Sequence, residues 1–156
     1  MSTSLIDMAE RLATKLDLSY NRCEEDEIII KLDGQRATYN LTVLLGREDV
    51  MYFSCNLNIL VPKRRRARLV DAIVKVNEQQ WLGHFDLSSK SRYIFYSLQI
   101  PFTSSFLAEE LIIEDSLRIV MAECDQFYHY FSALAMGDIP TGVSIDALML
   151  ESAGEA

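Results

Sequence analysis

Two neighbouring segments of the chain alternate between apolar and polar residues with a period of two. In residues 37–45 every second position is apolar, namely Ala37, Tyr39, Leu41, Val43 and Leu45. Residues 51–59 repeat the pattern with Met51, Phe53, Cys55, Leu57 and Ile59. Because successive strand residues point to opposite faces of a sheet, this alternation predicts two half-buried β-strands. We therefore expect an antiparallel sheet that is covered on one face.

Three further strands are predicted on either side of this pair. The β-branched run at residues 28–30 leads into Asp33-Gly34, a dipeptide typical of hairpin turns. A short strand is expected at residues 85–87. The last strand, residues 92–100, again has apolar residues on one face. The sheet is therefore expected to contain five strands.

Helical spacing of apolar residues predicts two helices around these strands. Residues 4–17 form the first, with Ser4 as N-cap and Asp7 as a weak capping-box partner. Pro62 suits the first turn of the second helix, where its missing N–H group has no hydrogen bond to lose. That helix is expected to run to about Trp81.

A long helix ends the ordered part of the sequence. Its apolar seam consists of Ile113, Leu117, Val120, Cys124, Phe127, Phe131 and Leu134. Gly137 and then Pro140 end it. The predicted order is α-β-β-β-α-β-β-α, an α+β fold in a single domain over residues 1–140. Residues 141–156 are expected to be a C-terminal tail, with a candidate short helix at residues 144–150 before a disordered end.

The charge of the chain is unevenly distributed. Residues 106–156 contain ten acids and the single base Arg118, a net charge of −9, whereas residues 1–105 carry a net charge of +1, which together give −8. This balance argues against nucleic-acid binding and against adhesion to an anionic membrane. The first residues lack the basic start and apolar core of a signal peptide, and no run approaches the ~18 apolar residues of a membrane span. We expect a cytoplasmic protein without a membrane or nucleic-acid partner.

Residue types and motifs that are typical of catalytic sites are scarce in the sequence. The glycines are isolated, so no phosphate-binding loop is present in the sequence. A metal site at His84 and Asp86 is conceivable because alternate strand residues share a face, but a surface histidine is the favoured interpretation. Cys55 and Cys124 lie on apolar faces and are interpreted as buried hydrophobic residues. We predict no enzyme, with no catalytic residue, metal or cofactor.

A basic cluster opens the second predicted helix: Lys63, Arg64, Arg65, Arg66 and Arg68. The helix dipole disfavours positive charge at this end by about 0.3–1 kcal/mol per residue. Three interpretations remain open. The cluster is a solvated face, or it pairs with an acidic partner such as the last helix within or between chains, or it binds nucleic acid or phosphate.

Two aromatic residues form the second candidate feature. Tyr93 and Phe95 lie on the opposite face of their strand from its main apolar stripe. If helices cover only one face of the sheet, these side chains are exposed and form a partner-binding patch. If helices cover both faces, they belong to the core. We favour the core, because aromatic residues fill strands for packing reasons alone.

The order of motifs resembles that of the YbjN family of small bacterial proteins. The matching points are Val61-Pro62, a charged helix ending in 76–78, the sequence Gly-His-Phe at 83–85, and the strand beginning at Tyr93. The resemblance extends from about residue 5 to residue 140. It implies a fold similar to that of the type III secretion chaperones, which are small, acidic and usually dimeric and hold extended segments of secreted proteins. Members of the family are labelled regulators of sensory transduction. The dense basic cluster is a departure from the family pattern.

Together with the acidic composition and the scarcity of catalytic residue types, the resemblance implies a non-enzymatic protein-interaction or chaperone-like module. It would capture a segment of a partner protein by strand addition or in an apolar groove. The alternative is a signalling regulator that binds a small ligand or a partner protein. A homodimer is expected, because the second helix is a candidate self-packing element. The candidate partner-binding residues are Tyr93, Phe95, Lys63, Arg64, Arg65, Arg66 and Arg68.

Overall fold

A computed structural model describes residues 4–102 and 108–137 of the 156-residue chain. Its helices are α1 Leu5–Lys15, α2 Arg66–Asn77 and α3 Glu109–Met136, with short 3-10 turns at η1 Arg47–Asp49 and η2 Lys63–Arg65. Its strands are β1 Tyr20–Glu24, β2 Glu27–Asp33, β3 Thr38–Leu45, β4 Val50–Leu60, β5 His84–Leu87 and β6 Tyr93–Pro101. The strands form one antiparallel sheet in the order β1-β2-β3-β4-β6-β5. The predicted α+β class and single domain are confirmed.

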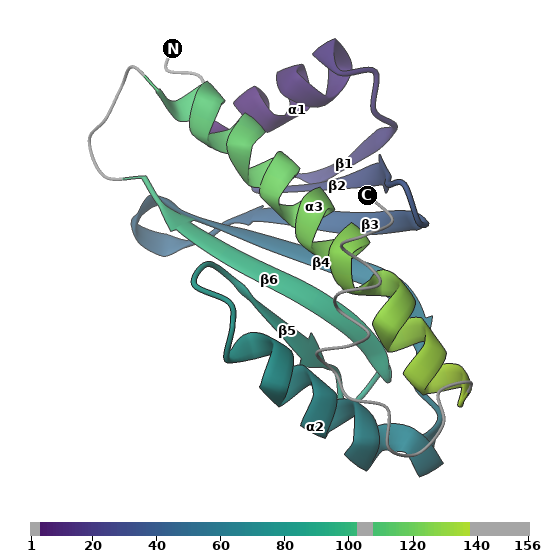
Figure 1. Cartoon of the computed structure of the whole chain (residues 1–156). Coiled ribbons are helices and arrows are strands. Elements are labelled where there is room, and N and C mark those ends of the chain that lie inside the picture. The colour runs from purple at the N-terminus through teal and green to yellow at the C-terminus, as the bar shows by residue number, and fades with distance from the viewer. Residues whose placement is uncertain (1–3, 103–107, 138–156) are drawn as a thin grey trace.

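All three helices lie on one face of the sheet. In Figure 1, α3 crosses the sheet diagonally, while α1 lies near β1 and β2 and α2 lies near β5. Strands β2 to β6 turn every second residue toward the helices, and most of these residues are buried, as in the cross-strand row Ile28, Val43, Phe53 and Leu98. This covered face and the helices enclose one core. We call the opposite face, which no described helix covers, the open face.

The first helix begins as its sequence predicts. The Ser4 hydroxyl accepts the Asp7 N–H at 3.0 Å, and the Asp7 carboxylate accepts the Ser4 N–H at 3.2 Å. This capping box satisfies backbone donors that have no partner inside the helix. Arg22 on β1 then binds the carboxylates of Asp7 and Glu10 at 3.0 and 2.9 Å, which ties the helix to the edge of the sheet.

The sheet has one strand more than the sequence predicted. β1 is a solvent-exposed edge strand, and only Arg22 within it is even half-buried. Its residues carry no apolar alternation, because backbone pairing with β2 holds it rather than side-chain burial. Residues 24–27 supply the end of β1 and the start of β2 as well as the turn between them.

The second helix is shorter than predicted and ends at Asn77 rather than near Trp81. The Asn77 side chain both accepts the Phe85 N–H at 2.8 Å and donates to the Phe85 carbonyl at 2.9 Å, so it joins the helix end to β5. The last helix ends at Gly137 as predicted, with a φ of 80° that favours glycine. The predicted tail at residues 141–156, with its short helix, lies outside the described residues.

An aromatic group fills the core between α3 and the β5–β6 end of the sheet. The Phe85 ring lies 5.0, 5.4 and 5.1 Å from the rings of Tyr96, Phe127 and Phe131, measured between centroids. Such tilted and edge-on pairs add to the free energy gained from burial. Within residues 4–102 and 108–137, no helix has the length and hydropathy needed to cross a bilayer.

Candidate functional site

The open face carries both aromatic residues that the sequence singled out. Tyr93 and Phe95 lie on β6, are half-buried, and point away from the three helices. The prediction that favoured core positions for them is therefore wrong, because the core helices all pack on the other face. An irregularity in β4 between Asn56 and Leu60 brings Leu60 opposite Tyr93. Leu60 is 49% exposed, and we call Leu60, Tyr93 and Phe95 the aromatic patch.

The rest of the open face is mainly polar. The row that crosses its middle contains Ile29, Thr42, Ser54, Ser97 and His84. At the opposite end from the aromatic patch, Leu44 and Tyr52 pair across β3 and β4, and both are exposed. The open face thus presents two apolar areas separated by hydroxyl and amide side chains.

The basic cluster does not act as one surface, because its members point in different directions. The Arg65 guanidinium lies against Gly137, so closely that a side chain at Gly137 would collide with it. The carbonyl end of α3, where the helix dipole is negative, is thus beside a cation. Arg68 lies near Tyr130 of α3: burial raises the pKa of Tyr130 to about 12, Asp71 adds to this, and Arg68 opposes it. Arg64 is exposed.

One interpretation of the basic cluster was that it pairs with the acidic last helix, α3, and the structure supports only a limited contact between them. Arg65 meets the last turn of α3, but the densest acids of that helix, Glu109, Glu110, Glu114 and Asp115, are in its first turns. At 1.5 Å per residue, the 28 residues of α3 separate its two ends by roughly 40 Å. The contact is therefore with the end of the helix rather than with its acidic start.

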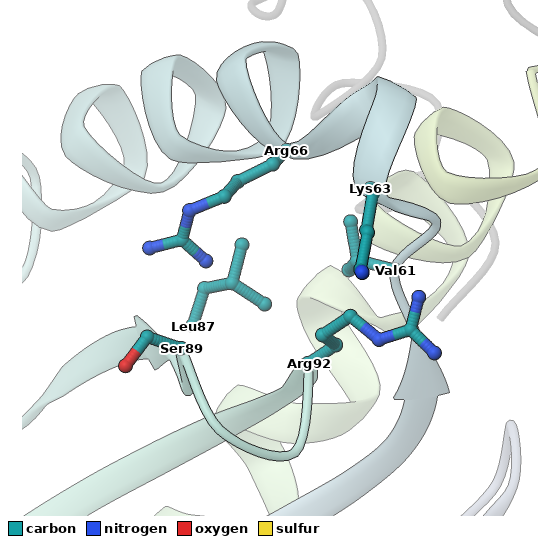
Figure 2. A pocket seen from close by; sticks show the side chains of 6 residues that line it. All are labelled: Val61, Lys63, Arg66, Leu87, Ser89 and Arg92. Atoms are coloured by element: carbon teal, nitrogen blue, oxygen red, sulfur yellow. The ribbon is translucent and has the colours of Figure 1, made fainter.

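Lys63 and Arg66 line a hollow at the start of α2. We call it the basic hollow; its volume is about 350 Å³, and it is lined by Val61, Lys63, Arg66, Leu87, Ser89 and Arg92. Figure 2 shows Lys63 and Arg66 projecting from the start of the helix, with the turn that follows β5 on the opposite side of the opening. Val61 and Leu87 are buried and supply an apolar floor. Three cations therefore lie around one concave surface, and its described lining residues include no acid.

Backbone hydrogen bonds fix the two walls of the basic hollow. The Arg92 carbonyl accepts the Val61 N–H at 2.9 Å, which joins the β5–β6 turn to the chain entering α2. Within the turn, the Arg92 N–H donates to the Ser88 carbonyl at 2.9 Å. Arg92 adopts a φ of 64°, a left-handed conformation that is uncommon for a residue other than glycine. The sequence did not single out Arg92, because only this turn brings it beside Lys63 and Arg66.

A second hollow of about 380 Å³ lies between the end of α1, the β2–β3 turn and α3. We call it the apolar hollow, because five large apolar residues line it, namely Leu16, Leu18, Leu32, Leu117 and Met121. Its charged residues are engaged within the chain. Arg118 binds Glu114 at 2.8 Å, and Asp125 binds the β2–β3 turn.

Asp125 is the main polar contact between α3 and the sheet. Its carboxylate accepts the Tyr39 hydroxyl at 2.6 Å and the N–H groups of Gln35 and Arg36 at 3.0 and 3.2 Å. Burial, together with this hydrogen bond, raises the pKa of the Tyr39 hydroxyl and keeps it protonated as a donor. The Asp125 carboxylate therefore holds the hairpin against α3, a structural role that no sequence motif indicated.

Other titratable side chains in the core also have a structural role, because burial favours their uncharged forms. Cys55 and Cys124 are buried as predicted; their mutual hydrogen bond, with burial, raises the pKa of the Cys124 thiol, which keeps it in its unreactive form. Burial raises the pKa of Glu123, although a hydrogen bond from Gln80 opposes the shift. Burial, with a smaller contribution from Glu123, also raises the pKa of Tyr96.

His84 and Asp86 do share the open face, as their spacing in β5 requires, and both are exposed. Among residues 4–102 and 108–137, no group of three or more His, Cys, Asp or Glu side chains is arranged to hold a metal ion. The surfaces with distinctive chemistry are instead the aromatic patch, the basic hollow and the apolar hollow. All three are suited to binding.

Two solved structures share this architecture. One is the crystal structure of the ExsC–ExsE complex, with 12% identity, a TM-score of 0.53, and coverage of 87% of this chain and 93% of the other. The second is the crystal structure of YbjN, described as "a putative transcription regulator from E. coli", with 13% identity, a TM-score of 0.51, and coverage of 78% and 93%. At these identities the similarity defines a fold class: a six-stranded antiparallel sheet with its helices on one face.

The sequence profile of the YbjN family, described as "Putative bacterial sensory transduction regulator", matches residues 6–133. The chain therefore belongs to the YbjN family, and the resemblance predicted from its motifs is confirmed. The family description names a regulator rather than an enzyme. No curated protein matches the chain.

Proposed function

We propose that this protein is a non-enzymatic, chaperone-like interaction module that binds a segment of a partner protein. The observation that carries the proposal is the sheet with all its described helices on one face, which leaves large apolar side chains on the other. Leu44, Tyr52 and Leu60 are 40%, 38% and 49% exposed on that open face. An apolar area without a covering element is a common sign of a protein interaction site.

The pattern of the open face suits an extended segment. Side chains of an extended peptide alternate, so one face of a bound segment can place apolar groups on the aromatic patch and on Leu44 and Tyr52. The hydroxyl and amide groups between these areas can bind backbone groups of the segment. The ExsC–ExsE complex shows that a protein of this fold class is found with a protein partner, which supports a partner for this chain.

We further propose that the protein is a cytoplasmic homodimer that associates through α2. Val70 and Val74 are one helical turn apart, face outward, and are 38% and 52% exposed. Trp81, just beyond the helix, is 94% exposed. Val70 and Val74 form an exposed apolar stripe on α2, and Trp81 adds an exposed apolar side chain beyond the end of the helix. Val74→Asp should convert the dimer to a monomer in light scattering, while Gln79→Asp should not; a native chain that is monomeric at every concentration would refute the dimer.

Partner binding can be tested by affinity capture from the native cell. The tagged native chain, Phe95→Asp and Gln99→Asp would be compared, because Gln99 is an exposed residue on the same strand and face. Circular dichroism and thermal unfolding would establish that each variant is folded. We expect a captured protein that Phe95→Asp loses and Gln99→Asp retains. A folded Phe95→Asp variant that keeps every partner would refute the role of the aromatic patch.

A second candidate function is that of a signalling regulator that binds a small ligand. The basic hollow favours it, since a volume of about 350 Å³ lies in the range of small-molecule sites, about 300–1,000 Å³. The two functions use different surfaces, because the residues of the basic hollow and those of the aromatic patch do not overlap.

A further inference from the structure

The charge of the basic hollow is the feature that the fold itself does not require. Lys63, Arg66 and Arg92 line the hollow, and none of them has an ion pair in the part of the chain that the structure describes. The positive end of the α2 dipole adds to their charge. Such an arrangement raises the electrostatic free energy of the empty protein and lowers that of a complex with an anion.

We infer that the basic hollow binds a small organic phosphate monoester. A phosphate monoester carries about −1.5 to −2 charges near neutral pH and three acceptor oxygens, whereas a carboxylate carries one charge. Guanidinium groups match phosphate oxygens with paired N–H donors, and lysine adds a compact charge. Two arginines and one lysine are therefore better balanced by phosphate than by a carboxylate.

The floor of the hollow indicates that the ligand has an apolar part. Val61 and Leu87 lie beneath the cations and are 1% and 7% exposed. A free phosphate ion would leave this apolar surface in contact with water, whereas an organic group attached to the phosphate would cover it. Ser89 on the rim provides a hydroxyl that can bind a further polar atom of the ligand.

Nucleic acid fits the same residues less well. A protein that tracks a nucleic-acid backbone needs a continuous basic stripe. Here Arg65 and Arg68 turn toward α3, so the basic cluster does not form such a stripe. The net charge of −8 also opposes a polyanion more than it opposes one small phosphate.

The hollow is already shaped in the unbound chain. The 2.9 Å hydrogen bond from the Val61 N–H to the Arg92 carbonyl joins its walls, and the Ser88–Arg92 bond closes the turn. Little backbone reorganisation is needed on binding, which favours affinity. This inference rests on the second candidate function and is independent of partner binding at the aromatic patch.

The probes for a test are phenyl phosphate, inorganic phosphate and benzoate. Each is titrated into the ¹⁵N-labelled full chain, and amide chemical shifts are followed. We expect saturable shifts with phenyl phosphate at millimolar concentration or below, centred on Val61, Leu87 and Ser89. Inorganic phosphate and benzoate should each bind about tenfold more weakly, since one lacks the apolar group and the other lacks the second charge.

Variants then distinguish binding in the basic hollow from attraction by the positive charge of the basic cluster as a whole. Arg66→Gln removes an exposed cation of the hollow, and it should weaken phenyl phosphate binding about tenfold. Arg64→Gln removes an equal charge from the same cluster but outside the hollow, and should change affinity less than about twofold. Phe95→Asp should leave phenyl phosphate binding intact, which separates this test from that of partner binding.

Three results would overturn the inference. They are no saturable binding of phenyl phosphate, equal binding of inorganic phosphate or benzoate, and equal weakening by Arg64→Gln and Arg66→Gln. The second would indicate a site for free phosphate or for any anion, and the third would indicate attraction by the cluster as a whole. Nucleic-acid binding that Arg66→Gln abolishes, without phenyl phosphate binding, would assign the surface to nucleic acid instead.

Discussion

The two faces of the sheet are built from the same strands but differ in residue type and in burial. On the covered face, the cross-strand rows of the central strands are apolar and mostly buried, as Val43, Phe53 and Leu98 illustrate. On the open face, the exposed large apolar residues Leu44, Tyr52 and Leu60 lie toward the two ends, and the row between them is mainly polar. The covered face is explained by the stability of the fold. The apolar residues of the open face are not, so they are the ones for which a binding role is proposed.

The same substitution on both faces gives the sharpest form of this comparison. Phe53→Ala on the covered face should lower the free energy of unfolding by about 3–5 kcal/mol, because it leaves a cavity in the core. Phe53 is 1% exposed, so no water can fill the lost volume. Urea unfolding followed by circular dichroism would measure the effect. A loss below about 1 kcal/mol would show that the covered face is not the core of the molecule.

Loss of the polar contact between α3 and the β2–β3 turn should give the second largest decrease in the free energy of unfolding. Asp125→Ala removes the acceptor of the Tyr39 hydroxyl and of two turn N–H groups. We expect a loss of about 2–3 kcal/mol, since the buried Tyr39 hydroxyl is left without a partner. Asp115→Ala, an exposed acid on the same helix, is the matched control and should change stability by less than about 0.5 kcal/mol. Equal effects of the two variants would contradict the structural role of Asp125.

Phe95→Ala, the open-face counterpart of Phe53→Ala, should have a smaller effect. Phe95 is half-buried and its removal opens no enclosed cavity, so we expect a loss of no more than about 1 kcal/mol. Partner capture by the variant should nevertheless fall. A loss as large as that of Phe53→Ala would place Phe95 in the core and remove the distinction between the faces.

The smallest effect concerns pH. Burial raises the pKa of Glu123 above its ordinary value of 4.5. As the pH rises from 4.5 toward the raised pKa, the folded state keeps a proton that the unfolded chain has lost, so stability falls across this window. Glu123→Gln stays uncharged and should escape this loss. It should therefore be more stable than the native chain at neutral pH, with the difference vanishing below pH 4.5.

Urea midpoints measured across this pH range would test the Glu123 prediction. Glu110→Gln, an exposed acid on the same helix, serves as the control. Identical pH profiles for Glu123→Gln and the native chain would show that Glu123 is as well solvated when folded as when unfolded.

Much of the fold was predictable because most of its elements bury one face. Alternation identified β3 and β4, and Ser4, Asp7 and Gly137 marked helix ends through local hydrogen bonds and backbone conformation. β1 was missed because its residues are mostly exposed and backbone pairing alone defines it. The end of α2 was misplaced because the Asn77–Phe85 hydrogen bonds that fix it join distant parts of the sequence.

The candidate sites were only partly predictable for the same reason. The sequence showed a basic cluster, but it could not show that Arg65 turns toward Gly137 while Lys63 and Arg66 line a hollow with Arg92. Whether Phe95 lies in the core or on the open face depended on which face of the sheet the helices cover, and strand periodicity alone leaves that undecided. Tertiary packing settles both questions.

The most direct test of the account is photocrosslinking from the open face in the native cell. A photoreactive phenylalanine analogue would replace Phe95 in one experiment and Phe53 in the other, and crosslinked peptides would be identified by mass spectrometry. We predict that position 95 crosslinks to one segment of another protein, whereas position 53 crosslinks only within its own chain. Intrachain products alone from position 95, in cells where the protein functions, would contradict the proposal that the open face binds a partner.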